Sequence, residues 1–150
     1  MHVDIIKDHK KDFLDLLLLA DEQEDMIDRY LERGTVFALY NDDLKSICVV
    51  TDEGDGVYEI QNLATYPEFQ KQGYGRFLIN HACDYFTDIG TTMLVGTGDS
   101  PLTVPFYEKS GFVFSHRIKD YIVEHYDEPI YEDGVQLKDK VYLARPLIAD

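Results

Sequence analysis

The hydrophobic positions of this chain follow strand-like and helix-like periods in turn, with no repeat and no low-complexity tract between them. Runs rich in Val, Ile, Tyr, Phe and Thr, bounded by Gly, Asn or Asp, predict strands. These runs lie at residues 3–6, 35–40, 46–51, 57–65, 93–96, 112–123 and 140–147. Because helical patterns lie between many of them, residues 1–150 are predicted to form one α/β domain.

Helical spacing predicts two helices near the N-terminus. The first carries its apolar residues on one side, at Phe13, Leu16, Leu17 and Ala20. Asp21, with Glu24 three residues later, is a capping-box pattern that predicts the start of the second helix. Gly34 follows the last apolar residue of that helix and is predicted to end it.

Two further helices are predicted in the second half of the chain. The longer one follows residue 75 and ends at Gly90. Its predicted apolar side consists of Phe77, Leu78, His81, Ala82, Tyr85, Phe86 and Ile89. Ser100 and Pro101 suit the N-cap and the first turn of the other helix, which Gly111 ends.

The charge balance is strongly acidic, with 14 Lys and Arg against 29 Asp and Glu and a net charge of −15. This balance argues against nucleic acid and against anionic membranes as partners, because both are bound through Lys and Arg. Cys48 and Cys83 lie among apolar residues and are predicted to be buried thiols. With no signal peptide and no apolar run long enough to span a bilayer, a cytoplasmic location is expected.

The most informative segment is QKQGYGR, residues 70–76, between a predicted strand and the long helix. Its glycines allow a ligand to approach the backbone closely, and the first N–H groups of the helix are free donors at its positive end. Together they predict an anion site suited to a phosphate or pyrophosphate. The segment lacks the third glycine of a dinucleotide fingerprint and the Lys-Ser/Thr of a P-loop. A nucleotide-binding module remains an alternative on these residues alone.

A second motif, FYEKSGF at residues 106–112, lies downstream. With it, the chain resembles the GNAT superfamily of acyl-CoA-dependent N-acetyltransferases. The coenzyme loop of that family reads Gln/Arg-x-x-Gly-x-Gly/Ala, which residues 70–75 match, and its second signature is a Tyr-bearing helix that ends in Gly-Phe. The resemblance covers about residues 1–147. It implies a mixed α/β fold whose central, mostly antiparallel twisted sheet has about six or seven strands and about four flanking helices.

The resemblance also implies acetyl-CoA as co-substrate and no metal. Backbone groups of Leu63, Ala64 and Thr65 would hold the pantetheine arm and direct an N–H at the thioester carbonyl. The pyrophosphate would be wrapped by backbone amides of Lys71, Gln72, Gly73, Tyr74, Gly75 and Arg76, and Gln70 at the start of the loop would also contact the coenzyme. Ser100 stands where the family often has a coenzyme-contacting Asn.

Tyr107 is the candidate general acid, since a phenol can protonate the sulfur of the departing thiolate. The alternative is a packing tyrosine on an amphipathic helix. Glu59 is the candidate base that removes a proton from the amine. It lies eleven residues before Gln70, the spacing of the catalytic Glu in the histone-acetylating branch of the superfamily. An exposed strand carboxylate is the alternative. Strand alternation predicts that Glu59, Gln61, Leu63 and Thr65 share one face, unless a bulge in this strand changes the parity.

Candidate acceptor residues are Gln61, Tyr121 and Tyr126. The stretch from residue 120 to 139 contains seven acidic residues and one lysine, which favours a cationic small-molecule or peptide amine. A solvated acidic loop explains the same composition equally well. A non-catalytic acyl-CoA sensor or scaffold is the alternative function. A homodimer is compatible with the resemblance, although no motif requires one.

Overall fold

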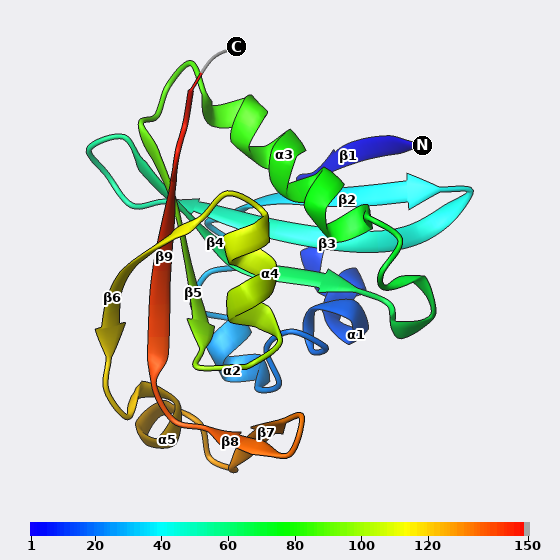
Figure 1. The fold of residues 1–150 in the computed structure, drawn as a ribbon. Helices are drawn as coiled ribbons and strands as arrows, with labels where there is room; N and C mark the ends of the chain where they lie inside the picture. Colours follow the sequence, from blue (N-terminus) through cyan, green and yellow to red (C-terminus); the bar gives the residue numbers. More distant parts are fainter. Residues whose placement is uncertain (149–150) are drawn as a thin grey trace.

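A twisted seven-stranded sheet runs through the middle of the molecule (Figure 1). The computed structural model describes residues 1–148. In spatial order the strands are β1 (His2–Ile6), β2 (Thr35–Asn41), β3 (Asp43–Asp52), β4 (Val57–Thr65), β5 (Thr92–Gly98), β9 (Lys140–Pro146) and β6 (Val113–Ile118). Only β4 and β5 pair in parallel; the other neighbours are antiparallel. This architecture confirms the predicted fold class.

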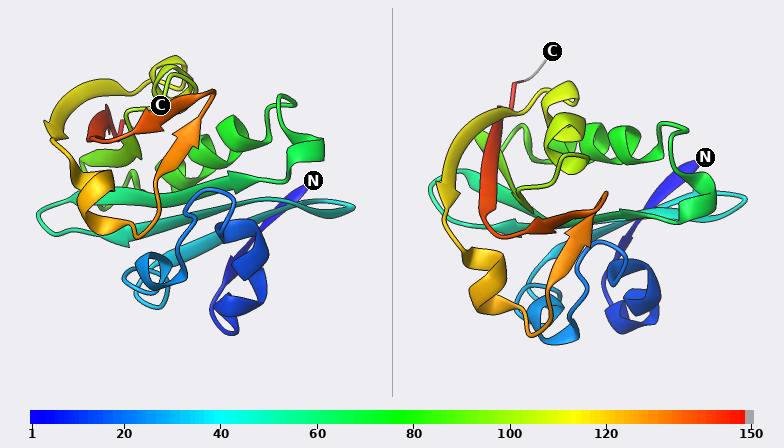
Figure 2. Two further views of the ribbon diagram at one scale, coloured as in Figure 1. Left: turned by 90° about the horizontal axis from the view of Figure 1, so that it is seen from below. Right: turned by 60° about the horizontal axis from the view of Figure 1, so that its bottom comes forward.

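Helices cover both faces of the sheet (Figure 2). On one face lie α3 (Tyr74–Phe86) and α4 (Thr103–Lys109). On the other lie η1 (Lys10–Phe13), α1 (Leu14–Leu17) and α2 (Glu24–Ile27). The remaining elements are η2 (Pro67–Phe69), α5 (Tyr121–His125) and a hairpin of β7 (Ile130–Glu132) and β8 (Val135–Leu137).

Two apolar clusters fill the spaces between the sheet and its helices. Successive side chains of a strand point to opposite faces, so β3 contributes Cys48 to the α3 side and Ile47 and Val49 to the α1–α2 side. Burial on both faces explains the unbroken apolar run at residues 47–50 in the middle of β3. Helix α3 turns a narrower face inward than its sequence predicts, since Phe77 and Tyr85 are exposed. Its buried residues are Leu78, Ile79, Ala82, Cys83 and Phe86.

Strands β4 and β5 separate halfway along their length. They are paired only from Val57 to Ile60 on β4 and from Thr92 to Val95 on β5. Beyond this point β4 stays paired with β3, while β5 stays paired with β9. The second halves of the two strands therefore diverge and leave a gap inside the sheet (Figure 1).

A β-bulge lies on β4 where the strands begin to separate. Val49 of β3 faces Asn62 and Val50 faces Ile60, so Gln61 has no partner in the ladder. The extra residue reverses the alternation. Gln61 donates to Thr51 and Asn62 donates to the Leu17 carbonyl, so both side chains point to the α1–α2 side.

The bulge corrects the predicted face of β4. Glu59 and Gln61 share the α1–α2 face, but Leu63 packs into the cluster beneath α3. Thr65 lies on that same side, since its hydroxyl is near Gly75 of α3. The prediction that all four residues share one face is therefore wrong.

The start and the end of the second predicted helix, at Asp21 and Gly34, also differ from the prediction. Residue Gln23 occupies the N-cap position of α2, and no side chain caps it, so the Asp21–Glu24 capping box is wrong. Gly34 does not have a positive φ; a Cβ there would lie 2.6 Å from Val49 and 2.9 Å from the Tyr30 carbonyl. Gly34 is thus required by close packing of the chain against β3 and not by a left-handed helix end.

The strand predicted at residues 112–123 is shorter than expected. It ends at Ile118, and Asp120 has a left-handed φ of 58° that starts α5. Asp139 accepts the Asp120 N–H at 2.8 Å and stabilises this turn. At α4, Ser100 Oγ accepts the N–H groups of Leu102 and Thr103, at 3.0 and 3.2 Å, as an N-cap side chain does.

Lys10 binds the backbone of residues 31–34, at the end of the segment that follows α2, from inside the protein. Its side chain is buried, and Nζ donates to the carbonyls of Leu31, Glu32 and Gly34 at 3.2, 2.9 and 2.9 Å. The Leu31 carbonyl also accepts the Gly34 N–H at 3.3 Å, so Lys10 adds to the backbone bonds at this end of the segment. The ammonium group therefore fixes the α1–α2 layer to the start of β2.

Replacing Lys10 with Met should destabilise the protein by roughly 2–4 kcal/mol, because it leaves buried carbonyls without a donor. Urea unfolding at neutral pH measures this loss. Lys7→Met is the control, since Lys7 is exposed on the same segment. Equal effects of the two substitutions would show that the carbonyl contacts of Lys10 contribute nothing.

Candidate active site

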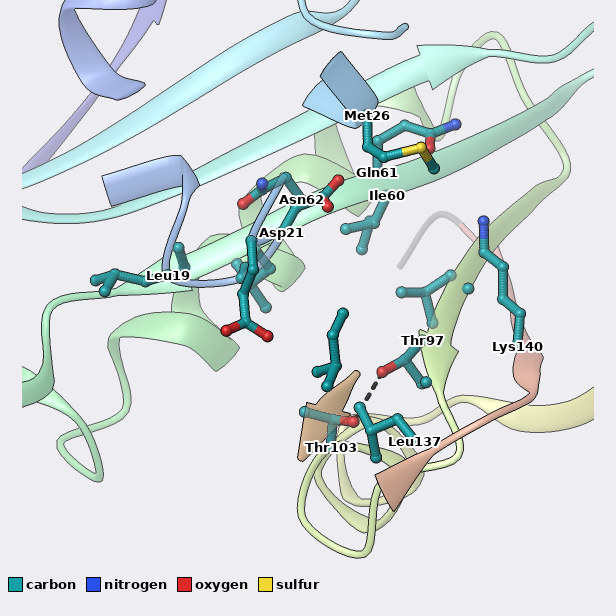
Figure 3. Close-up of a pocket in the computed structure, with 18 of the residues that line it drawn as sticks. Leu19, Asp21, Met26, Ile60, Gln61, Asn62, Thr97, Thr103, Leu137 and Lys140 are labelled. Atoms are coloured by element: carbon teal, nitrogen blue, oxygen red, sulfur yellow. Dashed lines mark hydrogen bonds between the residues drawn. The ribbon is translucent and has the colours of Figure 1, made fainter. Parts of the chain in front are cut away.

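The gap between β4 and β5 opens into a cavity of about 460 Å³ (Figure 3). It extends from the ends of these two strands to the α1–α2 loop on one side and to α4 and α5 on the other. The predicted site residues that line it are Gln61, Leu63, Ala64, Thr65, Gln70, Tyr107, Tyr121 and Tyr126. Glu59, Ser100 and residues 71–76 do not line it. The cavity thus brings together residues from distant parts of the chain.

The predicted coenzyme loop leads into α3 with its backbone donors free. Lys71 and Gly73 have φ of 63° and 90°, and Gly73 occupies the N-cap position without a side-chain cap. The first N–H groups of this 13-residue helix are consequently open to a ligand. A Cβ on Gly73 would meet nothing within 4 Å, so the space in front of the helix is open.

Gly75 lets the loop pack closely against α4. A Cβ there would lie 3.3 Å from the Phe106 ring, and Thr65 and Leu63 are also within 4 Å. Gln70 Nε2 donates to the Thr65 carbonyl at 3.2 Å, which holds the loop against the end of β4. Free backbone donors, a positive helix end and the exposed cations of Lys71 and Arg76 suit a diphosphate group.

Tyr107 reaches the cavity from α4. Its side chain is buried between Phe106 and Phe112, with ring centroids 5.2 and 5.6 Å away. Within residues 1–148 its hydroxyl has no hydrogen-bond partner. Burial raises the pKa of the Tyr107 hydroxyl, so the phenol keeps its proton at neutral pH. It can therefore act as a donor to a group in the cavity.

Glu59 is buried on the α1–α2 side of β4, opposite Thr51 of β3. Burial raises the pKa of its carboxyl group, while the charge of Lys140 lowers it to a smaller extent. Glu53 and Arg33, 3.1 Å from each other, lie within electrostatic range of Glu59. A carboxyl group whose pKa is raised towards neutrality is better suited to accept a proton than an exposed one.

Asp21 lies on the opposite wall of the cavity from the Tyr107 helix and is hydrogen-bonded by two tyrosines. The Tyr126 hydroxyl donates to Oδ1 at 2.6 Å, and the Tyr30 hydroxyl donates to Oδ2 at 2.9 Å. Asn62 Nδ2 donates to the Tyr30 hydroxyl at 3.0 Å. Burial raises the pKa of Asp21, although both tyrosine bonds and Lys140 act against the shift. Sequence reasoning missed this cluster because a capping pattern offered a local role for Asp21.

Lys140 and Tyr121 form a further wall. Lys140 Nζ lies 4.7 Å from the Tyr121 ring centroid and 5.0 Å from that of Tyr142. Tyr121 also stacks on His125, with centroids 3.9 Å apart. Lys140 was not predicted as a site residue, since it is one cation at the start of the last strand. Its position next to the cavity follows only from the pairing of β9 with β5.

Within residues 1–148 no three His, Cys, Asp or Glu side chains are grouped as a metal site. The same residues include no helix that is long and apolar enough to cross a membrane.

The comparison with known proteins decides the family. The model of the acetyltransferase (GNAT) family matches residues 3–112. This chain belongs to the GNAT family of acetyltransferases. The resemblance drawn from residues 70–76 and 106–112 is therefore confirmed, and so is the predicted enzyme class. A nucleotide-binding module of another kind is excluded.

Relatives match the GNAT domain over nearly its whole length. An uncharacterized N-acetyltransferase of Bacillus subtilis, YvbK, is 34% identical over 146 residues, which are 95% of this chain and 94% of YvbK. A GNAT acetyltransferase of Elizabethkingia anophelis with acetyl-CoA bound is 28% identical, with a TM-score of 0.90 and 97% coverage of both chains. A Bacillus subtilis acetyltransferase in complex with CoA is 33% identical, with a TM-score of 0.89 and coverage of 98% and 99%.

Replacing Glu59 with Gln should stabilise the protein at pH 7–8. Because burial raises the folded-state pKa above the unfolded one, stability is lost as the pH rises from the unfolded-state pKa to the folded-state pKa, and the loss persists at higher pH. The melting temperature of the variant should exceed that of the wild type by a few degrees near neutrality, and the difference should vanish near pH 4. Glu128→Gln, at an exposed residue, should change little. Destabilisation by Glu59→Gln at neutral pH would contradict this account.

Proposed function

We propose that this GNAT protein transfers an acetyl group from acetyl-CoA directly to a primary amine of a small molecule or peptide, with residues 1–150 acting as one domain. The observation that carries the proposal is the gap between β4 and β5. It joins the coenzyme loop at Gln70 to a cavity that Tyr107 lines from the far side. A thioester at the end of β4 would therefore meet an acceptor without a covalent acyl-enzyme. Cys48 and Cys83 are both buried, which agrees with that route and with a reducing, cytoplasmic setting.

The chain offers acetyl-CoA two kinds of backbone contact. The free N–H groups at the start of α3 would bind the pyrophosphate, with Lys71 and Arg76 close by. The edge of β4 from Leu63 to Thr65, which β5 no longer covers, would pair with the pantetheine arm. Ser100 already caps α4 with its hydroxyl, so we assign it a supporting role at most.

The reaction needs an activated acetyl group, which the thioester supplies. The amine nitrogen forms a bond to the carbonyl carbon, and the C–S bond breaks with its electron pair leaving on sulfur. An N–H group at the open edge of β4 would stabilise the oxyanion. Tyr107 would donate its proton to the sulfur, since burial keeps the phenol protonated.

The amine also loses a proton, and we propose that Glu59 takes up this proton. Glu59 does not line the cavity, whereas Gln61 of the adjacent bulge and Lys140 do. We therefore propose that the proton reaches Glu59 through water and not by direct contact. We also propose Gln61, Tyr121 and Tyr126 as parts of the acceptor wall. A homodimer remains a prediction; sedimentation of the purified protein at several concentrations would test it.

Replacing Gly73 with Ala should weaken CoA binding roughly tenfold, because the new Cβ projects into the open space before α3. Calorimetric titration with CoA measures the affinity. Gly54→Ala is a matched control, since Gly54 has a φ of 88° and equally open surroundings in a remote turn. Both variants should lose about 1–2 kcal/mol of stability through left-handed strain. Equal CoA affinities in the two variants would contradict the proposed loop.

Replacing Tyr107 with Phe should lower kcat by roughly 10²–10⁴-fold while acetyl-CoA binding stays intact. Thiol release from acetyl-CoA across a panel of primary amines measures turnover. Glu59→Gln should give a loss of similar size and remove the basic group from the pH–rate profile. Tyr85→Phe, at an exposed residue of α3, is the control.

Two results would contradict parts of this proposal. A protein that binds acetyl-CoA but transfers nothing to any amine would be a sensor or scaffold. Full activity of Tyr107→Phe would leave the acetyltransferase activity in place and remove the role of Tyr107 in it.

A further inference from the structure

Two buried acceptor atoms at the cavity have no donor. Within residues 1–148, Asn62 Oδ1 and Glu132 Oε2 are the buried side-chain atoms without a hydrogen-bond partner. Both residues line the same cavity, and Asn62 is only 3% exposed. A buried acceptor without a donor is costly, so each such atom calls for an explanation. Both atoms would be satisfied by N–H donors of a ligand.

The orientation of the Asn62 amide is fixed by its neighbours. Its Nδ2 donates to the Leu17 carbonyl at 3.0 Å, and a carbonyl can only accept. Turning the amide over would leave that carbonyl facing another acceptor. The unpaired atom of Asn62 is therefore its oxygen, Oδ1. The Nδ2 of the same amide also donates to the Tyr30 hydroxyl.

The hydroxyl protons around Asp21 are all directed at its carboxylate. Tyr30 and Tyr126 each donate their one proton to Asp21, so neither hydroxyl is left to donate to a ligand. The groups around Asp21 consequently present acceptors to the cavity and no free hydroxyl donor. These acceptors are the Asp21 carboxylate, the Asn62 amide oxygen and the Glu132 carboxylate.

Three cationic side chains, Arg29, Arg33 and Lys140, line the cavity wall. Arg33 pairs with Glu53 at 3.1 Å, and Lys140 lies over the rings of Tyr121 and Tyr142. Arg29 is exposed. None of the three forms an ion pair with Asp21 or Glu132 within the described residues. Figure 3 shows Asp21 and Lys140 on different sides of the cavity.

We propose that Asp21, held by Tyr30 and Tyr126, binds a second, protonated amine of the acceptor, so that the preferred substrates are diamines or longer polyamines. The inference rests on the proposed function, which supplies the reacting amine at the other end of the cavity. Asp21 and Asn62 lie on the α1–α2 side of β4, whereas Tyr107 packs on the α3 side. An acceptor that meets both must pass through the gap in the sheet. Two hydroxyl donors hold the Asp21 carboxylate in one orientation and counter the effect of burial on its pKa, which suits an anchor.

Three probes with the same reacting end test the proposal: 1,5-diaminopentane, 1-aminopentane and 5-aminopentanoate. Their far ends are cationic, neutral and anionic. We expect kcat/KM for the diamine to exceed that for the monoamine by roughly tenfold or more, and the anionic probe to be the poorest. Asp21→Asn keeps an oxygen for the tyrosines and removes the charge. It should bring the ratio of diamine to monoamine to about one, mainly through KM.

A binding measurement keeps this test independent of turnover. The diamine is titrated into the full-length protein saturated with CoA, with Asp88→Asn as a control of equal charge change at an exposed residue in the turn after α3. Wild type and Asp88→Asn should bind alike, and Asp21→Asn should bind roughly tenfold more weakly or worse.

The outcomes separate this inference from the proposed function. Asp21-dependent binding of the diamine without acetyl transfer would contradict the proposed function and support the anchor. Transfer to 1-aminopentane with no preference for the diamine would support the function and overturn the anchor. If Asp21→Asn lowered kcat/KM equally for all three probes, Asp21 would be a base or a packing residue, and the anchor would be overturned. A preference for 5-aminopentanoate would indicate that Lys140 binds the far end of the acceptor, and it would also overturn the anchor.

Discussion

The loss of pairing between β4 and β5 beyond Ile60 and Val95 is the constraint on which the rest of this structure depends. Each strand keeps its other neighbour, so the sheet loses only the ladder between these two strands. The four paired residues on each side hold the strands together at one end. At the other end a fully covered sheet gains an opening that reaches both faces, which a continuous seven-stranded sheet would not have.

The two sides of this opening carry opposite kinds of group. On the α3 side lie free backbone N–H groups and a protonated phenol at Tyr107, all of them donors. On the α1–α2 side the tyrosine hydroxyls direct their protons at Asp21, which leaves acceptors facing the cavity there. The bulge at Gln61 adds to the second side, because it turns both Gln61 and Asn62 towards it. A chain of net charge −15 thus places its donors on the wall where an anionic group would bind.

Sequence patterns predicted the parts of this arrangement that local rules govern. The bounds of β4 agree at both ends, and the glycines of residues 70–76 marked the loop before α3. The bulge was missed, because alternation carries no signal for one unpaired residue. Asp21 was assigned to a helix cap, since its partners Tyr30 and Tyr126 are brought to it by tertiary structure alone. Helix α5 was hidden in an apolar run that also fits a strand, and its start depends on Asp139.

The hydrogen bond from Tyr126 to Asp21 joins residues 105 positions apart in the chain. Closing so large a loop costs conformational entropy that only the completed fold repays. During synthesis, Asp21 leaves the ribosome long before Tyr126 exists, and β9 and its Lys140 follow later still. The acceptor wall is therefore among the last parts of the molecule to form. A nascent or C-terminally truncated chain can build the α1–α2 layer and the coenzyme loop and still have no complete place for an acceptor.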